Sequence, residues 1–295
     1  MGTVRENANQ WASELDDLIR GASGGFLFGI PLLYTMEVWW IGASVSMLRA
    51  LLALVLTFAI VLMLNRTAGF RKTVDSNLKD EAMDTVEALA IGIVCAGLIL
   101  ILLREITLET PLNEALGKII YESVPFTLGV ALANQFLGEQ KGEQKARDEN
   151  HNSPLAKSSK AYALNATLSD VGGTLIGSLI IAFNIAPTDE IPMLAVAVDG
   201  LWLLGIMVAS LMISYAIVFA AGFANQSKRQ QQQGIFQRPA SETIAAYLLS
   251  LLAALGMLLF FDKLSSNDPW QIWLSHTILL ALPATVGGAA GRLAV

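Results

Sequence analysis

The chain has 295 residues, of which 54% are hydrophobic and 15% are charged, and its mean hydropathy is +0.55. Soluble domains carry about 25% charged residues, and several runs here exceed the ~18 apolar residues that suffice to cross a bilayer. These numbers exclude an ordinary soluble domain and predict an all-α fold, a polytopic transmembrane helical bundle. The only cysteine, Cys95, excludes an intrachain disulfide and a thiolate metal cluster.

The apolar runs predict about eight spans, preceded by an amphipathic cytoplasmic segment, residues 1–21. Within that segment Trp11, Leu15 and Leu18 recur at helical spacing, which is typical of a helix lying on the membrane surface; a frayed tail is the alternative. The sixth run is too long for one straight crossing, so we expect it to tilt or to begin in the interface. The predicted spans are 22–42, 44–64, 82–103, 118–137, 161–186, 192–222, 243–261 and 271–293.

The basic residues orient this arrangement. Fifteen of the 19 lie on the two termini and on the loops between spans two and three, four and five, and six and seven. Only four lie on the other loops, namely Arg49, Arg104, Lys118 and Lys263. Because cytoplasmic loops are enriched in lysine and arginine, both termini are predicted to be cytoplasmic. The polar linker at 138–160 is then cytoplasmic too.

The two halves of the chain resemble each other. "GGFLFGIPLL" at 24–33 matches "GGTLIGSLII" at 172–181, an offset of 148, and "PFTLGVA" at 125–131 matches "PATVGGA" at 283–289, an offset of 158. The matches predict a parallel tandem repeat of four plus four spans, 22–137 and 161–295. Since four is even, the copies share one orientation, and a pseudo-twofold axis along the membrane normal is expected to relate them.

Small residues four positions apart let helix backbones approach closely in lipid. Gly25 with Gly29, and Gly173 with Gly177, have this spacing. Spans one and five are therefore expected to pack tightly, either against each other or in a homo-oligomer. Pro125 and Pro283 are expected to kink spans four and eight and to free carbonyl groups for other partners.

Five acidic residues fall inside the predicted spans. A charge at the bilayer centre costs at least ~2.5–3.5 kcal/mol, so such residues mark functional sites by default. No basic residue is expected close enough to neutralise these acids. None of the five acids has an acidic residue at its duplicated position in the matches above. The pattern predicts a channel or transporter for protons or cations, with a non-transporting scaffold or sensor as the alternative. The five residues are Glu37, Glu87, Glu122, Asp170 and Asp199.

Catalytic motifs are absent from the sequence: it has no H-E-x-x-H, no G-x-S-x-G and no P-loop. No enzyme activity, cofactor or nucleic-acid partner is expected, and no metal is assigned. The expected partners are the lipid bilayer, a proton or cation, and a second copy of the chain.

Two segments, "GGFLFGIPLLYTMEVWW" and "ESVPFTLGVALANQFLG", resemble a family of bacterial integral membrane proteins of unknown function. The resemblance runs over nearly the whole chain. It implies a location in the bacterial inner membrane and no particular activity or site residue.

Overall fold

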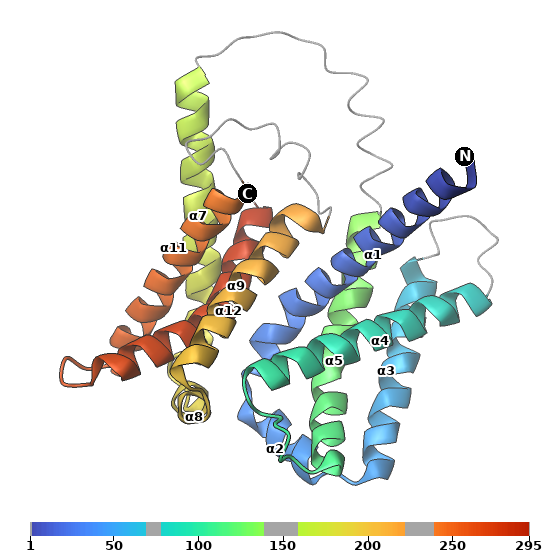
Figure 1. Cartoon of the computed structure of the whole chain (residues 1–295), viewed down its shortest axis with the longest axis horizontal. Helices are drawn as coiled ribbons and strands as arrows, with labels where there is room; N and C mark the ends of the chain where they lie inside the picture. Colours follow the sequence, from blue (N-terminus) through green and yellow to red (C-terminus); the bar gives the residue numbers. More distant parts are fainter. Residues whose placement is uncertain (1, 69–77, 139–158, 222–238, 295) are drawn as a thin grey trace.

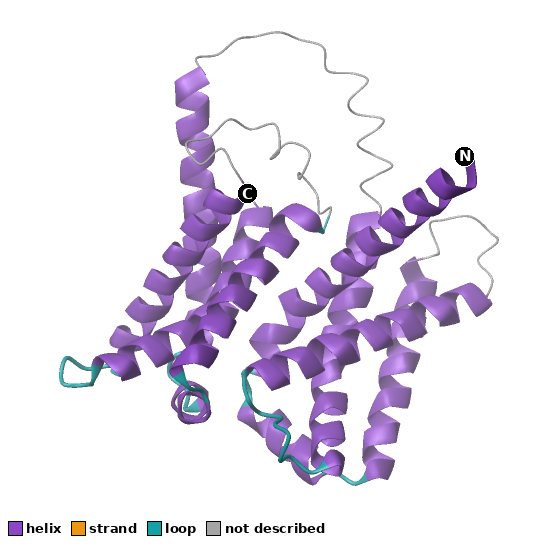
Figure 2. Ribbon diagram, in the orientation of Figure 1, coloured by secondary structure: helices purple, strands orange, loops and turns teal. Residues whose placement is uncertain are grey.

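The computed structural model describes residues 2–68, 78–138, 159–221 and 239–294, and all the secondary structure in these ranges is helical (Figures 1 and 2). The linker 138–160 lies almost wholly outside the described residues. Six helices are long and apolar enough to cross a membrane, or up to eight if each of two bent helix pairs is one span. The first half comprises α1 (Gly2–Leu33), α2 (Met36–Ser44), α3 (Met47–Ala68), α4 (Leu78–Leu102) and α5 (Leu112–Gly138). The second half comprises α7 (Ser159–Ile185), α8 (Glu190–Ala197), α9 (Gly200–Tyr215), the π-helix η2 (Ala216–Ala220), α11 (Pro239–Phe260) and α12 (Trp270–Ala294).

The first predicted span is broken. Helix α1 ends at Leu33, two residues after Pro31, and α2 leaves it at 91°. Carbonyl groups at a helix end need new partners, and here Thr35 Oγ1 donates to the Leu32 carbonyl while Trp39 Nε1 donates to the Leu33 carbonyl at 2.6 Å. These side chains make a sharp bend tolerable in an apolar environment.

The second half repeats this order of elements. Helix α7 ends at Ile185 and α8 leaves it at 88°, with Pro187 in the turn. The long sixth run is therefore not one straight helix, because the short helix α8 takes its first part and α9 with η2 the rest. The N-terminal segment predicted at 1–21 is not a separate helix, since α1 runs without interruption from Gly2 to Leu33.

Two turns at the same end of the bundle have the same geometry in both halves. After α4, Arg104 adopts a φ of 60°, and after α11, Asp262 adopts a φ of 58°. In each turn the following amide donates to a carbonyl five residues back, from Glu105 to Leu100 and from Lys263 to Leu258. This is the Schellman motif that ends helices, and its two copies are 158 positions apart.

Glycines bring the longest helices together within each half. A Cβ on Gly29 would overlap the Phe126 ring of α5, and a Cβ on Gly177 would overlap the Gly287 carbonyl of α12. Span one therefore packs on span four, and span five on span eight. Packing of spans one and five on each other was one of two expectations, and these helices share no comparable contact among the described residues.

The glycine contacts in the two halves give an offset that differs from the 148 positions of the sequence match. Gly129 meets the backbone of Gly24 and Gly25, and Gly287 meets that of Gly177. Gly24 and Gly177, which are 153 positions apart, therefore make the equivalent contacts, and Gly25 and Gly173 do not. The glycine-based alignment had taken the wrong one of two similarly spaced glycines.

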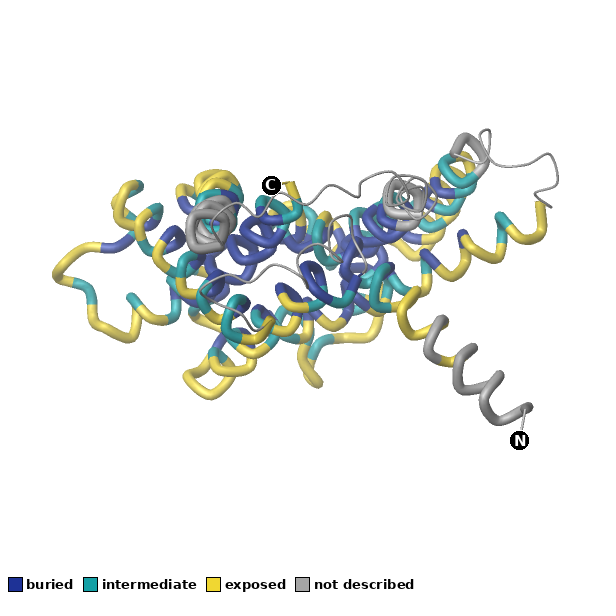
Figure 3. The backbone as a smooth tube through the Cα atoms, turned by 90° about the horizontal axis from the view of Figure 1, so that it is seen from above, coloured by how far each residue is buried: buried dark blue, intermediate teal, exposed yellow. Residues whose placement is uncertain are grey.

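The two halves meet head to tail. Helices α1 and α4 of the first half contact α9, η2 and α12 of the second. A twofold axis would also require α7 and α11 to contact α3 and α5, and no comparable contact occurs among the described residues. The expected pseudo-twofold relation is therefore wrong. Both chain termini lie at one end of the bundle (Figure 1), and the buried residues gather along its centre (Figure 3).

Candidate functional site

Glu122 is the most deeply buried of the five predicted acids. Its exposed fraction is 0%, and neither carboxylate oxygen has a hydrogen-bond partner among the described residues. It lies on the face of α5 that also presents Lys118 one turn before and Phe126 one turn after. Gly42 of α2 packs on Lys118, and Gly29 of α1 packs on Phe126. The Glu122 side chain therefore lies level with the break between α1 and α2.

A charged cluster lies on the side of Glu122 toward the α4–α5 turn. The Lys118 ammonium is 3.1 Å from the Glu114 carboxylate and 3.4 Å from the Glu105 carboxylate, and it donates to the Glu105 carbonyl at 3.0 Å. Burial raises the pKa of the Glu105 carboxyl, and Lys118 opposes that rise. Lys118 is itself buried and lies one helical turn before Glu122 on α5.

Residues 114, 118 and 122 recur every four positions, so one face of α5 carries a polar stripe of decreasing exposure. The side chains of Glu114 and Lys118 are 32% and 10% exposed, and Glu122 is fully buried. The residues 158 positions later are Ile272, His276 and Leu280, and Leu280 is fully buried. The two acids of this stripe therefore have no acidic residue at the positions 158 later.

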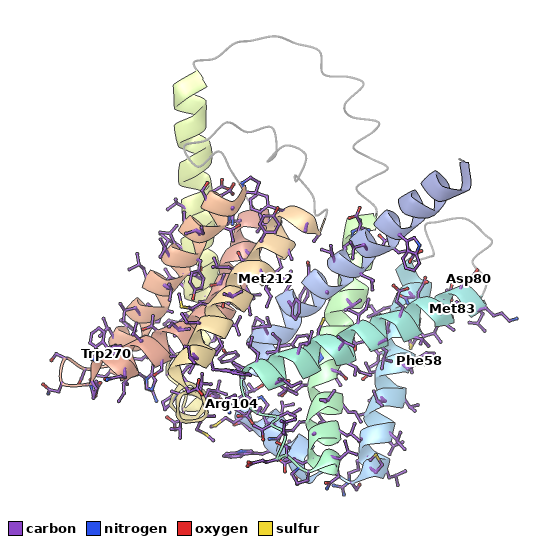
Figure 4. All side chains as sticks on the ribbon, in the orientation of Figure 1. Phe58, Asp80, Met83, Arg104, Met212 and Trp270 are labelled. Carbon is purple, nitrogen blue, oxygen red and sulfur yellow. The ribbon has the colours of Figure 1, made fainter. Side chains whose placement is uncertain are left out.

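Asp199 has two structural partners. Its carboxylate caps α9 by accepting from the Trp202 amide at 3.0 Å, and it lies 3.3 Å from the Arg104 guanidinium. Arg104 also stacks over the Trp202 ring, whose Nε1 donates to the Leu102 carbonyl. The prediction that no basic residue reaches these acids is wrong for Asp199. Figure 4 shows Arg104 at the end of α4, next to the second half.

The other three predicted acids lie apart from Glu122 along the chain and are less buried. Glu37 is exposed in the first turn of α2, where a carboxylate favours the positive end of the helix dipole. Glu87 is exposed on α4, and Asp170 is partly exposed on α7. The structure does not bring the five acids together into one site.

A sixth acid was missed by the sequence reasoning. Glu190 opens α8, is 5% exposed, and has one carboxylate oxygen, Oε2, without a partner among the described residues. It was assigned to a loop because the break before α8 was not recognised. Glu190 lies 153 positions after Glu37, the same spacing that separates Thr188 from Thr35 in the two bends, so an acid follows each bend at the same distance.

The prolines within α5 and α12 remove backbone donors as expected. Pro283 leaves the carbonyl of Leu279 without its helical amide, and the buried Tyr34 hydroxyl donates to that carbonyl at 2.8 Å. Tyr34 lies in the bend between α1 and α2, so this bond joins the bend to the second half. A lone acid and a tyrosine thus both lie at the break of the first span.

Long apolar helices, bent helix pairs and a carboxylate in the middle of a span define a polytopic α-helical integral membrane protein. The chain belongs to the family described as "Putative integral membrane protein (DUF2391)", whose model matches residues 17–295. This confirms the resemblance found in the sequence. No curated protein and no solved structure matches the chain.

Proposed function

We propose that the protein is a channel or transporter for protons, or for another small cation, in the bacterial inner membrane. The observation that carries the proposal is Glu122, a fully buried carboxyl group without a hydrogen-bond partner among the described residues. Keeping such a group in a span costs stability, so a functional role is the default explanation. The stripe from Glu114 through Lys118 gives it a polar approach from one end of the bundle.

A proton suits this site better than a multivalent cation. Calcium takes six to eight oxygen ligands and magnesium six, and no group of three or more His, Cys, Asp or Glu side chains that could hold a metal occurs in the part of the chain that the structure describes. One carboxyl group can take up and release a proton by itself. Glu122 is the exchanging residue in this proposal, and Glu37, Glu87, Asp170 and Asp199 are secondary.

We further infer that the chain is a tandem repeat of a bent helix pair followed by three helices. The bends of 91° and 88° support this, as do the matching turns at Arg104 and Asp262. Because Leu280 corresponds to Glu122, the second repeat has the same helices without the buried acid. The alternative function, a scaffold or sensor, rests on Asp199, whose cap and ion pair are structural.

Proton flux in liposomes tests the proposal. Purified protein is reconstituted with a pH-sensitive dye inside, and a potassium diffusion potential is imposed. We expect wild type to acidify the lumen faster than protein-free liposomes, and Glu122→Gln to abolish the difference because it cannot ionise. Glu109→Gln is the matched control, since Glu109 is exposed in the turn after α4 and is not one of the five acids of the proposal. Absence of proton and cation flux in wild type would favour the scaffold.

The proposed orientation places both termini in the cytoplasm and the turns after α4 and α11 outside. Leu108, in the turn after α4, and Leu78, at the start of α4, are both exposed. In a Cys95→Ala background we expect Leu108→Cys to react with a membrane-impermeant maleimide on intact cells. Leu78→Cys should react only after lysis. The reverse pattern would invert the topology.

A further inference from the structure

The head-to-tail contact between the halves leaves two surfaces free. In the inferred repeat, α1 and α4 correspond to α7 and α11, and α9 and α12 correspond to α3 and α5. The α1/α4 face of the first half is covered by the α9/α12 face of the second. The equivalent α7/α11 and α3/α5 faces lie at opposite sides of the bundle (Figure 1). We propose that the α3/α5 face of one copy docks on the α7/α11 face of a second copy.

Helix α3 differs from α9 in the way this proposal requires. Thr57 and Ser210, 153 positions apart, are both buried. Ile60 and Ile213 are also 153 positions apart, yet Ile60 is 40% exposed while Ile213 is 7% exposed. The same residue type is thus covered in the second half and uncovered in the first. A second copy docked on the α3/α5 face would cover Ile60.

Charge at the free faces is complementary. Inside the chain, Arg104 of one face pairs with Asp199 at the start of α9. The counterpart of Arg104 is Asp262, in the matching turn. Arg49, in the first turn of α3, has the position that Trp202 has in α9. Arg49 and Asp262 are exposed and make no ion pair among the described residues.

Inside the chain the positive residue lies after α4 and the negative one at the start of α9. At the free faces the negative residue, Asp262, lies after α11 and the positive one, Arg49, lies at the start of α3, so the two faces still attract each other. Docking in the manner of the two halves brings the Arg49 guanidinium of one copy to the Asp262 carboxylate of the next. The guanidinium can also donate to the carbonyl end of α11, as Trp202 Nε1 donates to the Leu102 carbonyl at the end of α4. Lipid alone would explain the apolar surface of α3 but not this complementary pair.

An interface between two different faces continues from copy to copy and closes into a ring when its rotation allows. The assembly is thus a cyclic homo-oligomer in which every half has the same kind of neighbour. The inference rests on the repeat and not on proton transport, so it can fail without affecting the role of Glu122.

Cross-linking in native membranes tests the interface. In a Cys95→Ala background, Arg49→Cys and Asp262→Cys are placed on separate, differently tagged copies and co-expressed. We expect a short bis-maleimide to join the two tags, and each variant expressed alone to give little dimer because like faces do not meet. Equal dimer from either variant alone, or no mixed dimer, would overturn the proposal.

Charge exchange supplies the second measurement. Arg49→Asp or Asp262→Arg alone should lower the cross-linked fraction, read from unrelated cysteine pairs along α3 and α7, by about five-fold. The double exchange should restore it, and Glu109→Arg, in the turn after α4, should leave it unchanged. Failure of the double exchange to restore cross-linking would also count against the pairing.

Discussion

Replacing Glu122 with leucine is expected to make the protein more stable and inactive in proton flux. A buried polar group without a partner costs about 1–3 kcal/mol, and both carboxylate oxygens of Glu122 are in that condition among the described residues. Leucine has a similar volume, and the equivalent position of the second half already carries the fully buried Leu280. The free energy of unfolding should therefore rise by about 1–3 kcal/mol.

The measurements are the thermal midpoint in detergent and the flux in liposomes, made on the same preparation. Glu114→Leu is the control, because Glu114 is partly exposed and paired with Lys118, so its loss should not stabilise the protein. A rise in midpoint together with a loss of flux would identify Glu122 as a residue kept at the expense of stability. A fall in midpoint would show instead that Glu122 has a structural partner and that the functional reading is wrong.

The sequence predicted the helices well because hydrophobic run length determines them. It did not predict the two bends, since each depends on side chains that follow the break. Thr35 and Trp39 satisfy the carbonyl groups at the end of α1, and Thr188 donates to the Ile185 carbonyl at 2.6 Å. Nothing in hydropathy distinguishes such residues from ordinary members of an apolar run.

The sequence predicted Glu122 as one of five candidate acids and did not single it out. Glu122 could not be ranked above Glu37 because burial depends on which helices cover a residue, and here α1 and α2 cover α5 on both sides of it. Asp199 was misjudged for the same reason, because Arg104 comes from a distant turn. The sequence showed the glycine spacing. Which glycines correspond in the two halves depends on where α5 and α12 pack on them, and the sequence alone does not show this.

The second large effect is expected at a glycine, in the substitution Gly177→Ala. A Cβ at Gly177 would overlap the Gly287 carbonyl of α12, which is backbone and cannot rotate away. The two helices must then separate, and overpacking of this kind costs about 1–3 kcal/mol or more. In lipid, close backbone contact is itself a main source of helix association, so the second half should loosen as a whole.

Gly172→Ala is the matched control on the same helix, because a Cβ there would meet nothing within 4 Å. Alanine is the better helix former, by about 0.5–1 kcal/mol, so this variant should melt at the same temperature as wild type or slightly higher. We expect the thermal midpoint in detergent to fall for Gly177→Ala and for Gly287→Ala alone. If all three variants melt alike, then α7 and α12 do not approach through these glycines, and the corrected repeat alignment, which pairs Gly177 with Gly24, loses its support.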